Sequence, residues 1–205
     1  MNRIIPRIGS IIVSITVLLF AICMLIPFDF GSYFVCMFLP IGYILMTVGF
    51  LNESDPKRKV TSITGVVFAG IYATLIFIVY FAQLTIVRTG QLGEEASLIL
   101  DFKKGGLLFN YDLLGYGIMA LSTFFVGLSI DAKTKADKWL KNMLMIHGIF
   151  FLGCLIMPMT DIFKSMAGGS SSKGGVVALE IWCLYFLPIG VLSTIHFWEK
   201  KKPLN

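Results

Sequence analysis

Charged residues are scarce in this 205-residue sequence. Only 14% are Asp, Glu, Lys or Arg, against roughly 25% in a typical soluble domain. Hydrophobic residues make up 57%, and the mean hydropathy is +0.84. This composition excludes a disordered chain, a nucleic-acid-binding protein and a secreted disulfide scaffold. The net charge of +5 comes from short basic clusters between apolar runs, a pattern typical of membrane topology.

Paired cysteines and enzyme signatures are also missing. The four cysteines stand singly within apolar runs, with no C-x-x-C pair and no Cys/His metal spacing: Cys23, Cys36, Cys154 and Cys183. We therefore expect inert thiols, no structural disulfide and no metal site. The sequence has no H-E-x-x-H, G-x-S-x-G, P-loop or dinucleotide-binding motif, so we expect no catalytic residues and no cofactor.

Long apolar runs are what the sequence does contain. A helix needs about 20 residues to cross a hydrocarbon core of ~30 Å, and six runs reach that length. They cover residues 8–28, 32–51, 60–87, 109–130, 139–160 and 175–198. Period-2 alternation is absent, and backbone groups in lipid must bond within their own segment, so these runs should be helices. The predicted fold is all-α: one polytopic membrane domain spanning 1–205, built as a bundle of six transmembrane helices.

The connections between these runs differ in basic charge. One side of the predicted bundle, which includes both termini, carries twelve basic residues: Arg3, Arg7, Lys57, Arg58, Lys59, Lys133, Lys135, Lys138, Lys141, Lys200, Lys201 and Lys202. The other side carries five: Arg88, Lys103, Lys104, Lys164 and Lys173. Because cytoplasmic loops are enriched in Lys and Arg, we expect both termini in the cytoplasm of a cell whose plasma membrane holds the protein. The first run is too long for a signal peptide and is interpreted as a retained helix.

Two features of the organisation leave alternatives open. The stretch 94–100, in the longest connection, predicts either a short interfacial helix or a plain loop, and 167–175 reads as a Gly/Ser-rich link. The string Phe38–Gly42 recurs as Phe186–Gly190 in the sixth run. The recurrence indicates either a parallel repeat of the kind found in transporters or a chance similarity in apolar sequence.

Polar side chains inside the runs are the candidate site residues. An ionisable group at the centre of a membrane helix costs at least about 2.5–3.5 kcal/mol, so each one requires an explanation. With cytoplasmic termini, all of the following fall in the outer leaflet: Tyr80, Gln83, Arg88, Asp112, Tyr116 and Glu180. Helical spacing places Tyr80 and Gln83 on one face and Asp112 and Tyr116 on another. We therefore predict an outward-facing ligand pocket. The structural alternative makes Asp112 a helix N-cap and Glu180 a packing residue.

The two histidines receive separate predictions. His147 is near mid-depth in the fifth run, where it either responds to pH or donates one hydrogen bond within the bundle. His196, beside Trp198, is expected at the membrane interface.

Two strings resemble segments of uncharacterised prokaryotic multi-helix integral membrane proteins. They are Tyr80–Arg88 and Asp112–Tyr116, and the resemblance extends over about helices three to five. No activity is assigned to those proteins. The resemblance implies only that these polar positions are a family feature.

These observations predict an integral membrane protein embedded in the lipid bilayer. The favoured function is a small-molecule binding or transport component with an unknown ligand. The alternative is a non-catalytic accessory or sensor protein acting through helix–helix contacts. The small-residue face of the third helix, Gly65 and Ala69, would then contact a membrane-protein partner.

Overall fold

The computed structural model describes residues 3–160 and 172–198, with side chains in the last segment described from residue 176. These residues form helices and connections, with no strand in the described ranges. Six helical segments are long and apolar enough to cross a membrane, which confirms the predicted all-α, six-span fold. In chain order the elements are α1 (Ile4–Leu25), α2 (Asp29–Cys36), α3 (Leu39–Glu53), η1 (Pro56–Arg58), α4 (Lys59–Ala82), η2 (Gln83–Val87), α5 (Glu94–Leu100), η3 (Phe102–Lys104), α6 (Leu107–Ser129), α7 (Lys135–His147), α8 (Phe150–Met159) and α10 (Ser172–Trp198).

Several spans begin earlier than the hydropathy predicts. The fifth starts at Lys135 rather than 139, because Thr134 and Asp137 form a capping box that starts the helix in polar sequence. The first starts at Ile4 rather than 8, with Pro6 in its first turn, where proline is tolerated. Hydropathy therefore locates the apolar part of each helix, while caps set where the helix begins.

Three spans are interrupted, which the hydropathy did not predict. The second changes from α2 to α3 at Met37 and Phe38, whose amides bond three residues back. The third ends in the π-helical turn η2. The fifth breaks between α7 and α8, where Gly148 and Ile149 also bond three residues back. Local departures from α-helical bonding of this kind often mark functional positions in helices.

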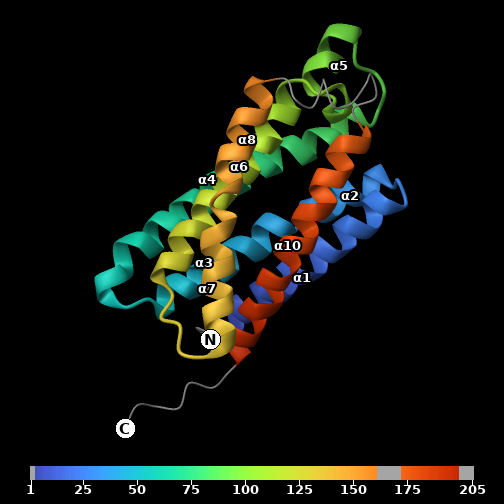
Figure 1. Ribbon diagram of the computed structural model, residues 1–205. Coiled ribbons are helices and arrows are strands. Elements are labelled where there is room, and N and C mark those ends of the chain that lie inside the picture. The colour runs from blue at the N-terminus through green and yellow to red at the C-terminus, as the bar shows by residue number, and fades with distance from the viewer. Residues whose placement is uncertain (1–2, 161–171, 199–205) are drawn as a thin grey trace.

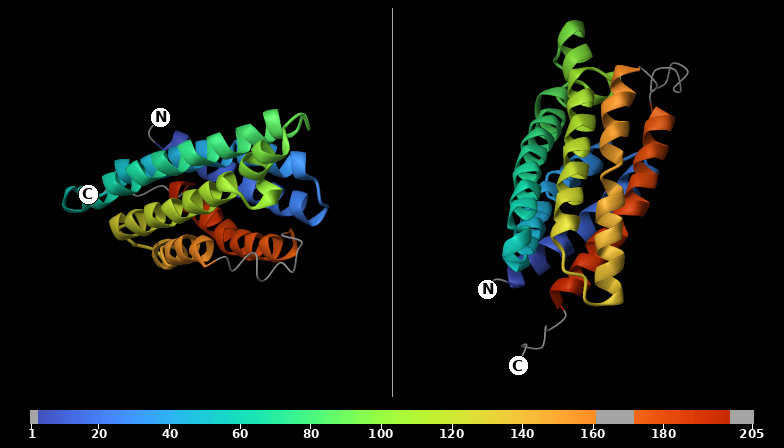
Figure 2. Two further views of the ribbon diagram at one scale, coloured as in Figure 1. Left: turned by 90° about the horizontal axis from the view of Figure 1, so that it is seen from above. Right: turned by 60° about the vertical axis from the view of Figure 1, so that its left-hand side comes forward.

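The bundle has two distinct ends. The start of α1 and the end of α10 lie together at one end, here called the terminal end, and the opposite end carries α5 and is called the distal end (Figures 1 and 2). The guanidinium of Arg7 lies 4.5 Å from the Trp198 ring centre, which joins the first turns of α1 to the end of α10. Helix α1 packs between α3 and α10, α4 packs along α6, and α6 also contacts α7 and α8.

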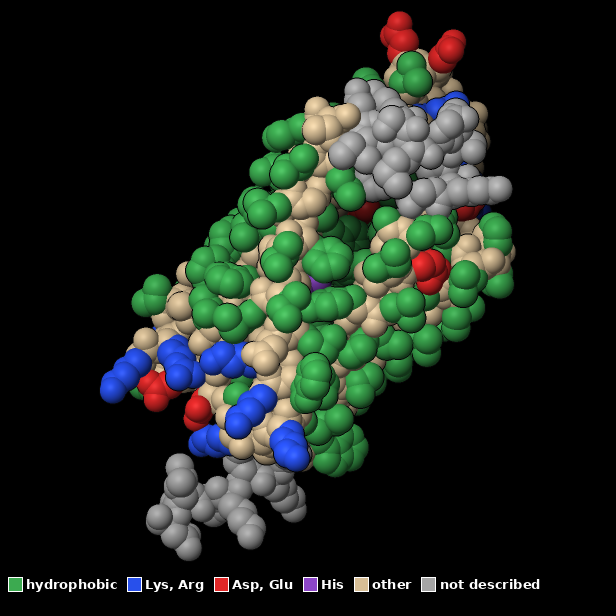
Figure 3. Space-filling view, viewed as in Figure 1, with side chains coloured by type: hydrophobic (Ala, Val, Ile, Leu, Met, Phe, Trp, Pro, Cys, Tyr) green, Lys and Arg blue, Asp and Glu red, His purple; other side chains and the backbone are tan. Residues whose placement is uncertain are grey.

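The distribution of charged and apolar side chains differs between the ends and the flank of the bundle. On the face shown in Figure 3, apolar side chains cover most of the flank, basic ones gather at the terminal end, and an acidic side chain stands within the apolar flank. Among described side chains, nine Lys and Arg lie at the terminal end and three at the distal end. The exposed apolar flank is the surface that a lipid environment would accommodate.

The two similar strings take different conformations. Pro40 is the second residue of α3, after the interruption, whereas Pro188 lies inside the continuous helix α10. Both strings nevertheless end in a glycine that faces α1. A Cβ on Gly42 would lie 2.7 Å from Ile12 Cγ2, and one on Gly190 would lie 2.6 Å from Ser14 Oγ. The strings thus share a packing role against α1 but occupy different positions in their helices.

The connections resolve one open alternative. Residues 94–100 form the helix α5, which projects at the distal end (Figure 1). Most of the predicted Gly/Ser-rich link at 167–175 lies outside the described residues.

Candidate functional site

A pocket of about 370 Å³ opens at the distal end of the bundle. It is formed where α2, η2 and the turn around η3 meet. Its lining combines charged, polar and apolar side chains: Asp29, Phe30, Tyr33, Gln83, Leu84, Val87, Arg88, Asp101 and Lys103. Of the residues singled out from the sequence, Gln83 and Arg88 line this pocket.

Gln83 fixes one wall of the pocket. Its side chain is 3% exposed, its Nε2 donates to Leu100 O at 2.8 Å, and its Oε1 accepts from Phe102 N at 3.0 Å. Both ends of the amide are therefore used to hold the connection after α5 against η2. Gln83 is a positioning residue for this wall.

Arg88 retains unused hydrogen-bond capacity in the pocket. Its guanidinium carbon lies 5.0 Å from the Phe30 ring centre, and no carboxylate of the described residues pairs with it. The other pocket cation, Lys103, forms an ion pair with Asp29. A guanidinium stacked on an aromatic ring keeps its N–H edge available for a planar anion.

Asp112 lies beneath this pocket in a group of buried polar side chains, here called the polar core. Its members are Cys36, Tyr72, Tyr80, Asp112 and Tyr116. Asp112 is 1% exposed and interacts with the Tyr80 hydroxyl, while its Oδ1 has no hydrogen-bond partner among the described residues. The hydroxyls of Tyr72 and Tyr116 are likewise buried without one.

Asp112 is not a helix cap, because the N-cap of α6 is Gly106. The carboxylate instead belongs to the helix interior, which removes the interfacial-cap interpretation.

One aromatic layer separates the pocket from the polar core. Tyr33 lines the pocket, and its ring centre lies 5.8 Å from that of Tyr80. Tyr80 therefore contacts a pocket residue on one side and Asp112 on the other.

Glu180 lies apart from the pocket. Its helix, α10, packs against α1 and α7 and reaches α6 through ring contact between Trp182 and Tyr116, at 4.9 Å. Glu180 is half-buried, and its Oε1 has no hydrogen-bond partner among the described residues. It does not line the distal pocket. The structure therefore forms two sets from the predicted site residues, and Glu180 belongs to neither. The pocket set is Gln83 and Arg88, and the polar-core set is Tyr80, Asp112 and Tyr116.

His147 has partners for both ring nitrogens. Trp182 Nε1 donates to His147 Nε2 at 3.0 Å, so the imidazole proton must be on Nδ1, which lies 2.8 Å from Thr123 Oγ1. That hydroxyl in turn bonds to Ala120 O at 2.8 Å. An indole N–H can only donate, so this arrangement fits a neutral imidazole. Of the two predicted roles, the geometry favours hydrogen bonding within the bundle, at the break between α7 and α8.

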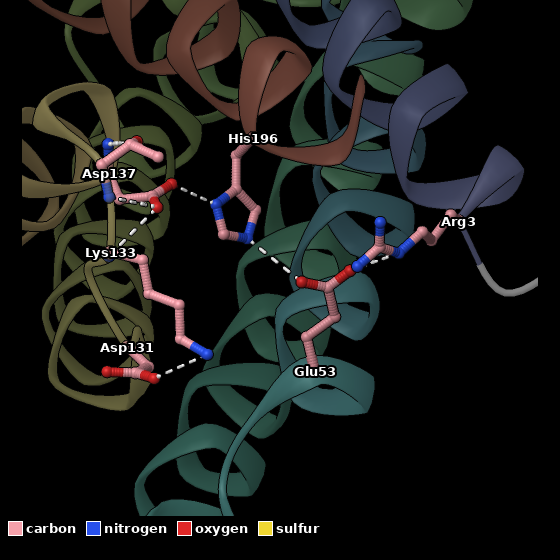
Figure 4. Close-up of polar contacts among 7 residues, drawn as sticks. Arg3, Glu53, Asp131, Lys133, Asp137 and His196 are labelled. Carbon is pink, nitrogen blue, oxygen red and sulfur yellow. Dashed lines mark hydrogen bonds and ion pairs between the residues drawn. The ribbon is translucent and has the colours of Figure 1, made fainter. Parts of the chain in front are cut away.

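His196 is buried within the bundle, near the terminal end of α10. Its Nδ1 lies 2.6 Å from Asp137 Oδ1, its Nε2 lies 3.3 Å from Glu53 Oε2, and the side chain of Arg3 pairs with Glu53 at 3.2 Å (Figure 4). Because both nitrogens face carboxylates, the doubly protonated imidazolium satisfies both contacts. This terminal cluster joins α1, α3, α7 and α10. The sequence signal for it was the placement of three ionisable residues at span ends on one side of the predicted topology.

No protein-family model matches the chain, and neither a curated protein nor a solved structure matches it. Within the described ranges, no group of three or more His, Cys, Asp or Glu side chains is placed to hold a metal ion.

Proposed function

We propose that this protein is a small-molecule binding component of the membrane, acting in transport, and that its ligand occupies the distal pocket. The observation that carries the proposal is a pocket of about 370 Å³ in which Arg88 has no carboxylate partner among the described residues. Pockets for small ligands typically measure about 300–1,000 Å³, so this volume suits a molecule at the small end of that range.

The lining favours a ligand that carries a carboxylate or a similar anionic group. Arginine donates two parallel hydrogen bonds to such a group, and stacking on Phe30 orients the guanidinium for this. Asp29 and Asp101 supply negative charge elsewhere in the pocket, which disfavours a purely anionic ligand. A small zwitterion with an apolar part that contacts Leu84 and Val87 fits this combination.

The interrupted helices support a transport role. Discontinuous helices in transporters place irregular backbone where it lines a binding site. Here the π-helical turn η2 contributes three pocket residues, and α2, which ends at an interruption, also contributes three.

The accessory or sensor alternative relied on a free small-residue face of α4. That face packs within the chain: a Cβ on Gly65 would lie 2.7 Å from Val126 Cγ2, and Ala69 is completely buried. Helix α6 therefore occupies the surface that a membrane-protein partner would have used.

An outward-facing pocket requires cytoplasmic termini. The nine-to-three excess of basic side chains at the terminal end supports this orientation in a plasma membrane. Alkaline phosphatase fused after Pro203 should be inactive in cells, and the same reporter inserted after Gly93 should be active. The opposite pattern would place the pocket in the cytoplasm.

The binding function is tested by thermal stabilisation of the purified protein in detergent. The probes are glutamate, leucine, glycine, acetate and inorganic phosphate. We expect at least one zwitterionic probe to raise the melting temperature, and we expect Arg88→Gln to abolish this shift. Lys104→Gln removes the same charge from an exposed residue that does not line the pocket, and it should leave the shift intact. Stabilisation that survives Arg88→Gln, or no stabilisation by any probe, would contradict the proposal.

A further inference from the structure

Among the residues that the structure describes, no basic side chain lies in the surroundings of Asp112. Asp112 lies five residues after Leu107, about 7 Å inside the distal start of α6. The titratable groups that interact electrostatically with it come from four helices: Tyr33 and Cys36 of α2, Tyr72 and Tyr80 of α4, Tyr116 of α6 and Cys154 of α8. Among the described residues, no Lys, Arg or His joins this set.

An ionised carboxylate in this position would be an isolated charge. It would cost at least about 2.5–3.5 kcal/mol within a membrane helix, and Oδ1 has no hydrogen-bond donor among the described residues. A neutral carboxylic acid removes the charge and adds an O–H group. The unpartnered hydroxyls of Tyr72 and Tyr116 belong to the same polar core and offer acceptor capacity.

Two tyrosines lie between Asp112 and the distal pocket. Tyr80 interacts with Asp112, and the rings of Tyr80 and Tyr33 are in contact. Tyr33 lines the pocket, which is open to solvent.

We propose that Asp112 is a proton-binding site inside the bundle, which exchanges its proton with water in the distal pocket. On uptake, a hydronium ion transfers its proton to a carboxylate oxygen, an O–H bond forms and a water molecule remains. On release, the O–H bond breaks and the proton returns to water. This site does not depend on the proposed organic ligand. In this proposal the bound ion is a proton, and its binding neutralises the Asp112 carboxylate between α4 and α6, the two helices packed along each other.

Infrared spectroscopy of the full-length protein in detergent tests the proposal. The wild type should show the C=O stretch of a protonated carboxylic acid at neutral pH, and this band should shift in D₂O. Labelling aspartate with carbon-13 should shift the band, whereas labelling glutamate should not, which separates Asp112 from Glu180 without any substitution.

Substitutions then assign the band. Asp112→Asn should eliminate the carboxylic-acid band. In Asp112→Glu the band should shift when glutamate, rather than aspartate, carries carbon-13. Asp131→Asn is the control, because that carboxylate is 60% exposed, and the band should persist. A wild type without the band would overturn the proposal, as would a band that does not exchange in D₂O. Stabilisation by Na⁺ that is lost in Asp112→Asn would instead identify a metal-cation site.

Discussion

Buried polar side chains in this bundle differ in how far their hydrogen-bond capacity is used. His147 and Gln83 have partners at both polar atoms, and these contacts hold helices and a connection in place. Asp112 has an unpartnered oxygen, and Arg88 has unused donors. Fully bonded groups suit a structural role, and groups with unused capacity suit binding.

The indole–imidazole contact should contribute measurably to stability. Trp182→Phe removes the donor and leaves His147 Nε2 buried without a partner, so we expect a loss of about 1–3 kcal/mol in the free energy of unfolding. Trp139→Phe is the matched control, since Trp139 is 67% exposed, and it should change stability little. Denaturant titration in mixed micelles measures both. Equal effects would contradict the structural role of the contact.

The terminal cluster should also be sensitive to a single change. His196→Ala leaves the carboxylates of Glu53 and Asp137 facing each other without the cation between them, and we expect a loss of about 3–5 kcal/mol. Lys133→Gln removes a cation whose own pair with Asp131 is exposed, so its cost should stay below about 1 kcal/mol. The same titration compares them, and a His196→Ala variant as stable as wild type would show that the cluster is not maintained.

Between helices, close approach depends on small residues. Gly65 of α4 faces α6, where an added Cβ would also meet the backbone at Ser122 O, 3.2 Å away. The Ser122 hydroxyl donates to Gly65 O at 2.6 Å, so the two helices are bonded where they are closest. Gly70 of the same helix has nothing within 4 Å of an added Cβ.

These two glycines give a matched test of the α4–α6 contact. Gly65→Ala should destabilise the protein by about 1–3 kcal/mol, because backbone cannot shift as a flexible side chain can. Gly70→Ala should be neutral or stabilising by up to about 1 kcal/mol through helix propensity. Thermal unfolding followed by circular dichroism distinguishes them. If both changes were equally harmless, α4 and α6 would not pack this closely.

The sequence predicted the positions of the helices but not their interruptions, because the two depend on different kinds of interaction. Hydropathy predicted all six spans, because the lipid requires a local run of apolar residues. It could not predict the interruptions at Met37 and Gly148, because these sit in apolar sequence that would also continue a helix. Pro40 and Pro188 show the same limit, since identical strings begin one helix and lie within another.

At the scale of the whole molecule, the site was partly predictable for a related reason. Depth from the topology placed Tyr80, Gln83, Arg88, Asp112 and Tyr116 toward the same end of the bundle. In the structure Gln83 and Arg88 line the distal pocket, whereas Tyr80, Asp112 and Tyr116 are buried. Which helices are neighbours is a long-range property, and the sequence did not indicate that α10 packs on α1 and α7. For the same reason Glu180 was grouped with residues it does not meet, and the contact of His196 with Glu53 was missed.

The central claim is that the distal pocket opens to the outside of the cell. A cysteine placed in the pocket by Val87→Cys, probed in intact cells with a membrane-impermeant maleimide, tests this most directly. Lys57→Cys, at the terminal end, is the control, and the native cysteines lie within the spans. Labelling of Val87→Cys in intact cells, with labelling of Lys57→Cys only after permeabilisation, is the predicted result. Labelling of Lys57→Cys in intact cells, with Val87→Cys protected until the membrane is opened, would contradict it.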